Sequence, residues 1–347
     1  MAGTHAQIMS AAELGIGLRL AGATRAEVRE ALWTERTLVK TFGPRGTVHL
    51  LPAQDLPAWA GALSAMPPAP SPFPEGVRMT ADQAEAVIEA IAQALSDAEL
   101  TVDELSEAVT EAAGSWAGDL VMPAFQVMWP RWRQVMHLAG MRGVLCFGPA
   151  RGRKVTYTSP RRWLPGFSPA PARPALVHVV TSFLRAYGPA TPRRFAHWLN
   201  APPRWAHEVF ASLPGELQQV EVEGVPAWVA AGDTAVPAVP PRCMRLLPYF
   251  DGYAYRVGNQ PSGLLYPGPA ADRVLPGNFQ VLLVDGVVAG LWHQRRAGRR
   301  VDITVEPLRP LTAGQRSELD RQGKRVGEIL QASARLAIGT VTVGGHA

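Results

Sequence analysis

The sequence contains few cysteines and no long apolar run. Only two of the 347 residues are cysteine, Cys146 and Cys243, and neither has a CxxC or Cys/His spacing. Neither a disulfide framework nor a zinc site is therefore indicated. Apolar runs such as Val281–Val284 are far shorter than the roughly 20 residues of a membrane-spanning helix, and no secretory leader is visible. We expect a cytoplasmic protein with no metal ion, no cofactor and no membrane partner.

Acidic residues are missing from one long segment. The net charge of the chain is +5, but between Asp119 and Glu208 there is no carboxylate at all, whereas twelve arginines and Lys154 occur there. Such a distribution is typical of a surface that binds a polyanion. Residues 82–119, directly before this segment, contain many acids and no base. We therefore expect residues 82–119 to face away from phosphate.

Two proline-rich stretches, 67–76 and 165–174, predict linkers. Proline fixes φ and lacks the N–H group that a helix interior or a central strand requires. Between and after these linkers, helices followed by strand-like runs recur in the same order. We predict an α+β fold with three tandem winged-helix units and a C-terminal β-rich, barrel-like domain. The expected boundaries are 1–66, 77–164 and 175–232 for the three units and 242–347 for the C-terminal domain.

Local patterns support this organisation. Apolar spacing predicts two short helices within Ser10–Lys40, and Arg45–Pro52 alternates as a strand does. Thr101 and Glu104 have the spacing of a capping box. The other expected helices are 81–95, 131–139, 175–187, 193–199, 203–212 and 313–336. The other strand-like regions are the hairpins 144–157 and 217–229 and the runs 244–250, 279–284, 287–294 and 301–305, with a turn at Asp285-Gly286.

Repeated winged-helix units in one chain indicate a protein that binds DNA. Such units place a recognition helix in the major groove and a wing on the backbone. A repressor gains its second half-site by forming a dimer, whereas several units in one chain can surround one duplex. We therefore expect double-stranded DNA as the partner and a monomer as the oligomeric state.

Four motifs resemble those of a known family. Arg45-Gly-Thr-Val-His49-Leu is similar to the Arg-Gly-Thr-x-His-Leu signature of the bacterial winged-helix DNA glycosylases of the AlkZ and YcaQ type. The other motifs are Phe147-Gly-Pro-Ala-Arg-Gly, Tyr187-Gly-Pro-Ala-Thr-Pro with Trp198, and Leu247-Pro-Tyr-Phe-Asp-Gly-Tyr followed by Val284–Trp292. The resemblance implies a monofunctional glycosylase that removes bulky alkylated purines and unhooks interstrand crosslinks in DNA repair or self-resistance.

The resemblance also implies a catalytic position near the N-terminus. The family has a Gln-apolar-Gln or Gln-apolar-Asp motif before the Arg-Gly-Thr stretch, and the matching residues here are His5-Ala6-Gln7, with histidine in place of the first glutamine. An N7-alkylated purine is a cationic leaving group, so the reaction needs a positioned water and stabilisation of the sugar rather than a general acid. Neutral His5 can accept a proton from that water, and Gln7 can hold it.

Further residues are predicted to line the cleft or to contact DNA. On the expected strand Arg45, Thr47 and His49 share one face, toward the active cleft; the alternative for His49 is a buried histidine bonded to backbone. Asp55 fits the first turn of a helix better than catalysis. The expected DNA-binding residues are Arg131, Arg133, Arg142, Arg151, Arg153, Lys154, Arg161, Arg162, Arg193, Arg194, Arg295, Arg296, Arg299 and Arg300, the last four in a loop between two strands.

Two other functions are compatible with the residues alone. A non-catalytic regulator or lesion-binding protein would bind DNA without producing an abasic site. A protein-interaction scaffold would bind its partners independently of salt, which the carboxylate-free basic segment disfavours. A Schiff-base lyase is disfavoured because Lys40 is the nearest lysine to His5 in the sequence.

Overall fold

Helices and strands are interspersed along the chain, which confirms the expected α+β class. The structure is a computed structural model that describes residues 1–124, 126–239, 242–254, 262–277 and 279–342. The expected C-terminal domain, 242–347, therefore includes short stretches outside the described residues. In the part of the chain that is described, no helix is both long and apolar enough to cross a membrane.

The N-terminal segment contains a small antiparallel sheet. Its elements are β1 (Thr4–His5), α1 (Met9–Gly17), α2 (Arg25–Trp33), β2 (Leu38–Phe42), the 3-10 turns η1 (Pro44–Gly46) and η2 (Ala53–Asp55), β3 (Val48–Pro52) and α3 (Leu56–Ser64). The strand order is β1-β3-β2. Successive side chains of a strand point to opposite faces. Accordingly Val39 and Leu51 enter one hydrophobic core, while Val48 and Leu50 enter a second.

The next two segments each contain three helices followed by a hairpin, and the first also has a short strand and a second hairpin that the other lacks. The first comprises α4 (Ala81–Ala94), β4 (Leu100–Thr101), α5 (Val102–Ala113), η3 (Ser115–Gly118), β5 (Leu120–Ala124), β6 (Val127–Pro130), η4 (Arg131–Val135), α6 (Met136–Met141), β7 (Cys146–Arg151), β8 (Lys154–Thr158) and α7 (Pro160–Trp163). The second comprises α8 (Ala172–Tyr187), α9 (Pro192–Leu199), α10 (Pro203–Ala211), β9 (Leu217–Val222) and β10 (Val225–Ala230). Both hairpins, β7–β8 and β9–β10, were expected.

The C-terminal segment is a five-stranded curled sheet with a long helix on one face. It comprises β11 (Met244–Leu247), α11 (Ser262–Leu265), α12 (Pro269–Val274), β12 (Gln280–Val284), β13 (Val287–Ala297), β14 (Arg300–Pro307), α13 (Ala313–Leu330) and β15 (Ser333–Ile338). The strand order is β11-β12-β13-β14-β15, with β15 parallel to β14. Asp285 and Gly286 have the positive φ values of a tight hairpin turn, as expected.

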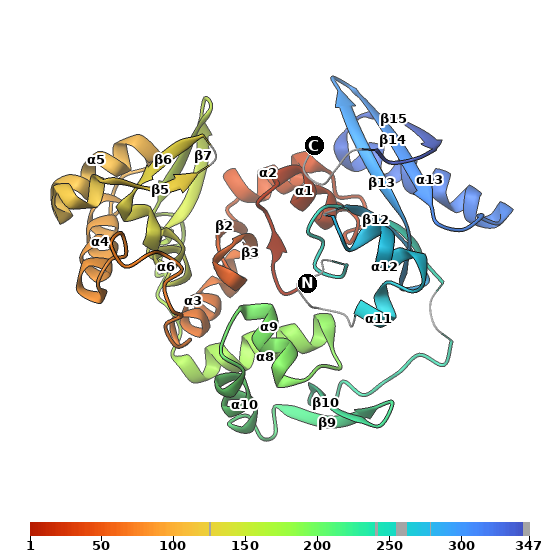
Figure 1. The fold of residues 1–347 in the computed structure, drawn as a ribbon, viewed down its shortest axis with the longest axis horizontal. Helices are drawn as coiled ribbons and strands as arrows, with labels where there is room; N and C mark the ends of the chain where they lie inside the picture. Colours follow the sequence, from red (N-terminus) through yellow and green to blue (C-terminus); the bar gives the residue numbers. More distant parts are fainter. Residues whose placement is uncertain (125, 240–241, 255–261, 278, 343–347) are drawn as a thin grey trace.

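The N-terminal segment lies in the middle of the molecule. Figure 1 shows α1, α2 and β1–β3 between the α4–α6 segment on one side and the curled sheet with α13 on the other, with α8–α10 below. The two ends of the chain meet where α1 packs on α13. Arg325 of α13 donates hydrogen bonds to the carbonyls of Gly17, Leu20 and Ala23 at 2.8 to 3.1 Å.

Several predicted boundaries were wrong. The helical pattern was expected to reach Lys40, but β2 begins at Leu38 because its residues pair with β3. The last helix was expected to reach Leu336, but Gln331 adopts a left-handed conformation that ends it. The residues after it alternate as a strand and pair with β14. Arg295 and Arg296 belong to β13 and Arg300 to β14, so only Arg299 of the four expected loop arginines lies in the turn.

A close contact at Gly61 fixes α3 against the second linker. A Cβ atom at Gly61 would lie 2.2 Å from the carbonyl oxygen of Ala170, a residue whose own N–H donates to the Pro57 carbonyl at 2.9 Å. Backbone cannot yield as a flexible side chain can, so only glycine allows this approach. The contact joins the N-terminal segment to the start of α8.

We expect Gly61→Ala to destabilise the protein although alanine is the better helix former. Alanine gains about 1 kcal/mol over glycine in a helix interior, but the clash with the Ala170 carbonyl should lower the free energy of unfolding by about 1 to 3 kcal/mol. Urea denaturation followed by tryptophan fluorescence measures this difference. Gly314→Ala in the first turn of α13, where a Cβ meets no atom within 4 Å, is the control and should not destabilise. Equal stability of the Gly61 variant and wild type would contradict the argument.

Candidate active site

The His5-Ala6-Gln7 motif lies at the edge of the N-terminal sheet. Thr4 and His5 pair with Leu50 and His49 of β3, and the Ala6 N–H extends the pairing by donating to the Val48 carbonyl at 2.7 Å. The side chain of Ala6 is buried, His5 is half-buried, and Gln7 is exposed in the bend before α1. The sheet therefore fixes the backbone at His5, whereas Gln7 faces solvent.

Aromatic rings surround the His5 imidazole. Its centroid lies 5.4 Å from that of His49, edge to face, and 4.7 Å from that of Phe250. Burial, followed by the positive charge of Arg45, lowers the pKa of His5 to about 4. The imidazole is thus neutral at neutral pH, the state that can accept a proton.

His49 is a buried histidine bonded to backbone, one of the two alternatives expected from the sequence. It is 4% exposed, and its Nδ1 lies 2.9 Å from the Thr47 carbonyl oxygen. A carbonyl only accepts, so Nδ1 carries the proton and Nε2 is unprotonated. Burial lowers the pKa of His49 to about 3. His5, His49 and Thr41 form one cross-strand row.

Arg45 and Thr47 do not belong to the strand, contrary to the sequence prediction. Pro44–Gly46 forms a 3-10 turn in which Arg45 has a left-handed φ of 61°, and the Thr47 hydroxyl donates to the Pro44 carbonyl at 3.0 Å. The prediction failed because Pro44 and Gly46 favour a turn over an extended backbone. Arg45 donates to the Trp198 carbonyl at 2.8 Å. The turn thereby connects the site to α9 and keeps a positive charge near His5 and His49.

The structure adds three residues to which the sequence motifs assigned no role. Asp251 is buried and forms a bidentate ion pair with Arg19, and its neighbour Phe250 contacts His5. The sequence offered one indication of Asp251, namely that it is the single acid in the aromatic motif Leu247–Tyr253. Arg19, 232 residues away, gives no sequence signal that identifies it as the partner.

A second buried carboxylate, Glu13, lies on α1. Its side chain is 1% exposed and lies 2.6 Å from Arg29 Nε and 3.9 Å from Arg25 Nε of α2. Burial raises the pKa of Glu13, against the opposite effect of Arg29. The buried carboxylate of Glu13 therefore holds α1 to α2 through two partly exposed arginines.

Acids of the segment 82–119 lie beside the basic β7–β8 hairpin, while the expectation that this segment faces away from phosphate stays a prediction. Arg151 and Lys154 of the β7–β8 hairpin lie 2.6 and 2.7 Å from the carboxylates of Glu104 and Asp103. The cause is the pairing of β4 with β8, which brings the first turn of α5 beside the hairpin. The acids there neutralise part of the positive charge expected to meet phosphate.

Other predicted DNA-binding residues also contact the protein itself. Arg142 pairs with Glu85 at 2.8 Å, and Arg131 pairs with Asp119 at 3.2 Å. Further contacts are those of Arg133 with the Trp129 ring, Arg162 with Thr158, Arg296 with the Gly298 carbonyl and Arg300 with Asp302. The exposed arginines of the set include Arg153, Arg161, Arg193, Arg295 and Arg299.

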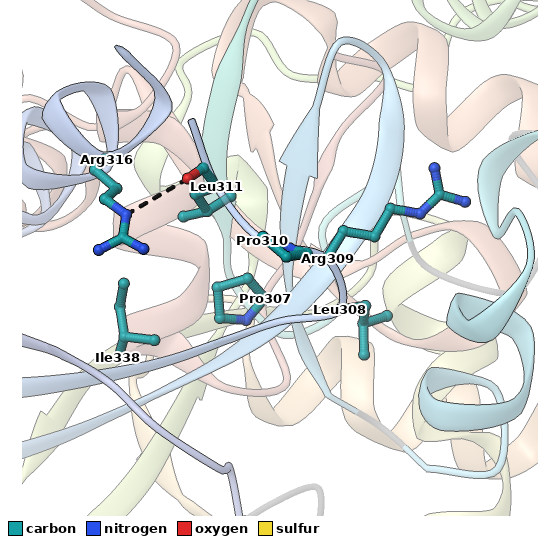
Figure 2. A pocket seen from close by; sticks show the side chains of 7 residues that line it. All are labelled: Pro307, Leu308, Arg309, Pro310, Leu311, Arg316 and Ile338. Carbon is teal, nitrogen blue, oxygen red and sulfur yellow. Dashed lines mark hydrogen bonds between the residues drawn. The ribbon is translucent and has the colours of Figure 1, made fainter. Parts of the chain in front are cut away.

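One pocket lies away from the residues around His5. It has a volume of about 310 Å³ and is lined by Pro307, Leu308, Arg309, Pro310, Leu311, Arg316 and Ile338. Figure 2 shows these side chains at the junction of β14, α13 and β15, with Arg316 directed to the Leu311 carbonyl. The residues that line the pocket include no acid, histidine or nucleophile, so the pocket offers no group that could catalyse hydrolysis. Among the described residues no three His, Cys, Asp or Glu side chains gather as metal ligands.

The chain matches a known family over nearly all of its length. The sequence model of the family "DNA glycosylase AlkZ-like" matches residues 1–329. The interstrand DNA cross-link repair glycosylase of Streptomyces sahachiroi is 32% identical over 310 residues, which cover 84% of this chain and 80% of that protein. The solved structure of the Streptomyces sahachiroi DNA glycosylase AlkZ aligns with a TM-score of 0.77 at 25% identity, over 97% of this chain and 91% of the other. The resemblance seen in the motifs is confirmed: this chain belongs to the AlkZ-like family and is a DNA glycosylase.

Proposed function

We propose that this glycosylase hydrolyses the N-glycosidic bond of bulky alkylated purines in double-stranded DNA, including purines joined in an interstrand crosslink. The relative from Streptomyces sahachiroi is described as a cross-link repair enzyme, which supports this substrate class. A crosslinked base cannot easily enter a closed pocket. The position of His5 and Gln7 at a sheet edge with Gln7 in solvent suits a lesion that stays in the duplex.

In the proposed mechanism His5 and Gln7 position and activate one water. His5 accepts a proton while the water oxygen bonds to the sugar carbon, and the carbon–nitrogen bond electrons move onto the cationic purine, which leaves neutral. The products are a free alkylated base and an abasic site. Gln7 holds the water through its amide and stabilises the positive charge that develops on the sugar. The nearby Arg45 charge then favours release of the proton from His5.

A lysine that could form a Schiff base does not share this face of the sheet. Lys40 pairs with Leu50, whose side chain enters the second core, and its Nζ lies 4.8 Å from the centre of the Phe147 ring. His5 and His49 belong to the other side-chain row of the same strands. The enzyme is accordingly proposed to be monofunctional, with hydrolysis and no lyase step.

We propose that the three repeated segments are winged-helix units, spanning 1–66, 77–164 and 175–232, and that 242–347 is a separate domain. The support is the recurrence of three helices followed by an antiparallel hairpin in α4–β8, where a further hairpin is inserted, and in α8–β10. The enzyme is proposed to act as a monomer that holds one duplex against the basic hairpins. The β7–β8 and β13–β14 hairpins extend from the same side of the molecule in Figure 1.

Base release from a duplex with one N7-alkylguanine tests the catalytic residues. His5→Ala and Gln7→Ala should each slow release by about 100-fold or more, as loss of acid–base or water-positioning groups does, and His5→Gln, which restores the glutamine of the family motif, should retain more activity. Abasic sites are counted after alkaline cleavage. His207→Ala, at an exposed position on α10, is the matched control and should behave as wild type. Unchanged release by both alanine variants would refute the assignment.

The pH dependence of base release provides an independent test of His5 as the base. Because burial and Arg45 lower the pKa of His5 to about 4, the neutral, active form persists as pH falls through the ordinary histidine range. We expect single-turnover release, corrected for spontaneous depurination, to stay level from about pH 8 to about pH 5.5 and to fall only as the pH approaches this lowered pKa. A loss of rate with a midpoint near the ordinary histidine value, about 6.5, would contradict a buried neutral base.

Salt dependence of DNA binding tests the exposed arginines. Arg153→Ala at the β7–β8 tip and Arg299→Ala at the β13–β14 tip should each weaken binding and reduce the slope of log K against log salt by about one. Arg204 on α10 is 92% exposed and pairs with Glu208, and Figure 1 places α10 on the other side of the molecule. Arg204→Ala is therefore the control. An equal loss in all three variants would show that the hairpins are not the contact surface.

A further inference from the structure

The motif Leu247–Tyr253 continues from β11 into a loop held by one partly buried ion pair. We call residues 248–253 the aromatic loop. Asp251 in this loop is 7% exposed, and its two carboxylate oxygens accept from Arg19 Nη1 and Nη2 at 2.7 and 2.8 Å. The same carboxylate accepts the Tyr253 N–H at 3.0 Å, and Arg19 also donates to the Gly15 carbonyl at 3.1 Å. The bridge thus connects the loop to α1, the helix that follows the catalytic motif.

The backbone of the aromatic loop is strained at Phe250. Its φ is 57°, a left-handed conformation that is uncommon for a bulky residue and persists only where the surroundings enforce it. This conformation brings the Phe250 ring to 4.7 Å from the His5 ring. The strained residue and the residue that forms the ion pair are adjacent, so the bridge is well placed to hold the ring where it lies.

Tyr187 at the end of α8 supports the loop from a third direction. A Cβ at Gly252 would lie 2.6 Å from the Tyr187 hydroxyl oxygen, so the loop backbone passes directly against this group. The same hydroxyl is hydrogen-bonded by the backbone of Ala2, and burial raises the pKa of Tyr187 to about 12. The loop, α8 and the residues just before β1 therefore meet beside His5.

We propose that the Arg19–Asp251 bridge and Phe250 are a positioning device for His5: the bridge holds the aromatic loop so that the Phe250 ring covers one side of the imidazole and fixes its orientation. This inference rests on the proposed role of His5 in hydrolysis. Arg19, Asp251 and Phe250 are positioning residues, because they act on the reaction through His5 and not on the substrate.

The groups around His5 determine whether its pKa rises or falls when the Phe250 ring is removed. Burial is the largest cause of the lowered pKa of His5, and the charge of Arg45 from η1 lowers it further, while the ring of His49 from β3 lies beside it. Arg19 and Asp251 carry opposite charges that cancel at close range, and Tyr187 is neutral at neutral pH. Removing the Phe250 cover lets water reach the imidazole and should therefore raise the pKa of His5 toward its ordinary value.

A histidine titration by NMR tests the device without requiring catalysis. The full chain has eight histidines, and the His5 signal is assigned as the one absent from His5→Gln. In wild type its midpoint should lie near 4. Phe250→Ala, which removes the ring, and Arg19→Met, which cuts the bridge, should both raise the midpoint by one unit or more, while Phe250→Leu, which keeps an apolar cover, should stay near wild type. If Arg19→Met does not fold, Asp251→Asn replaces it.

The control breaks a similar ion pair elsewhere. Arg273 also forms a bidentate pair, with Glu306 at 2.9 Å for both contacts, so Arg273→Met should leave the His5 midpoint unchanged. The acid limb of base release should move upward together with the His5 midpoint in the Phe250 and Arg19 variants. An unchanged midpoint in either variant would overturn the positioning role, whatever the glycosylase activity. A raised midpoint in an enzyme whose base release is unaffected by His5→Ala would support the positioning device and refute the catalytic role of His5.

Discussion

The pairing of the two-residue strand β1 with β3 is the interaction on which the candidate site depends. β1 has no second neighbour in its sheet, so this pairing supplies its inter-strand contacts. The register of this pairing sets His5 opposite His49 and leaves Ala6 on the buried side. Burial of Ala6 and of Ala2 in two different cores stabilises a strand that is too short to persist alone.

Much of the fold could be predicted from the sequence, because local patterns specify it. Capping boxes at Thr80, Thr101 and Thr312 mark real helix starts. The first proline-rich linker, 67–76, contains no helix or strand, whereas α8 begins at Ala172, within the second. What could not be predicted depends on distant contacts. β1 and β15 exist because other strands accept them as partners, and Arg45 leaves the strand because of the turn that Pro44 and Gly46 impose.

The candidate site could be predicted only in part, for the same reason. A family motif indicated His5 and Gln7, but the aromatic ring next to His5 comes from residue 250, and the ion pair behind that ring joins residues 19 and 251. The distribution of charge along the sequence predicted the distribution of charge on the surface poorly. Acids of α5 lie beside basic residues of the β7–β8 hairpin although more than 40 residues separate Glu104 from Arg151, so the two segments form one mixed-charge region.

The contact between α1 and α13 has a consequence for the order in which this enzyme becomes active during its synthesis. Arg325, which holds the carbonyls at the end of α1, leaves the ribosome about 300 residues after them. Domains usually fold in the order in which they are made, but α1, which also packs on α2 and β1, lacks its contact with α13 until almost the whole chain has emerged. A nascent or prematurely terminated chain would therefore contain the proposed catalytic residues without the contact that fixes the end of α1, and we expect it to release bases poorly.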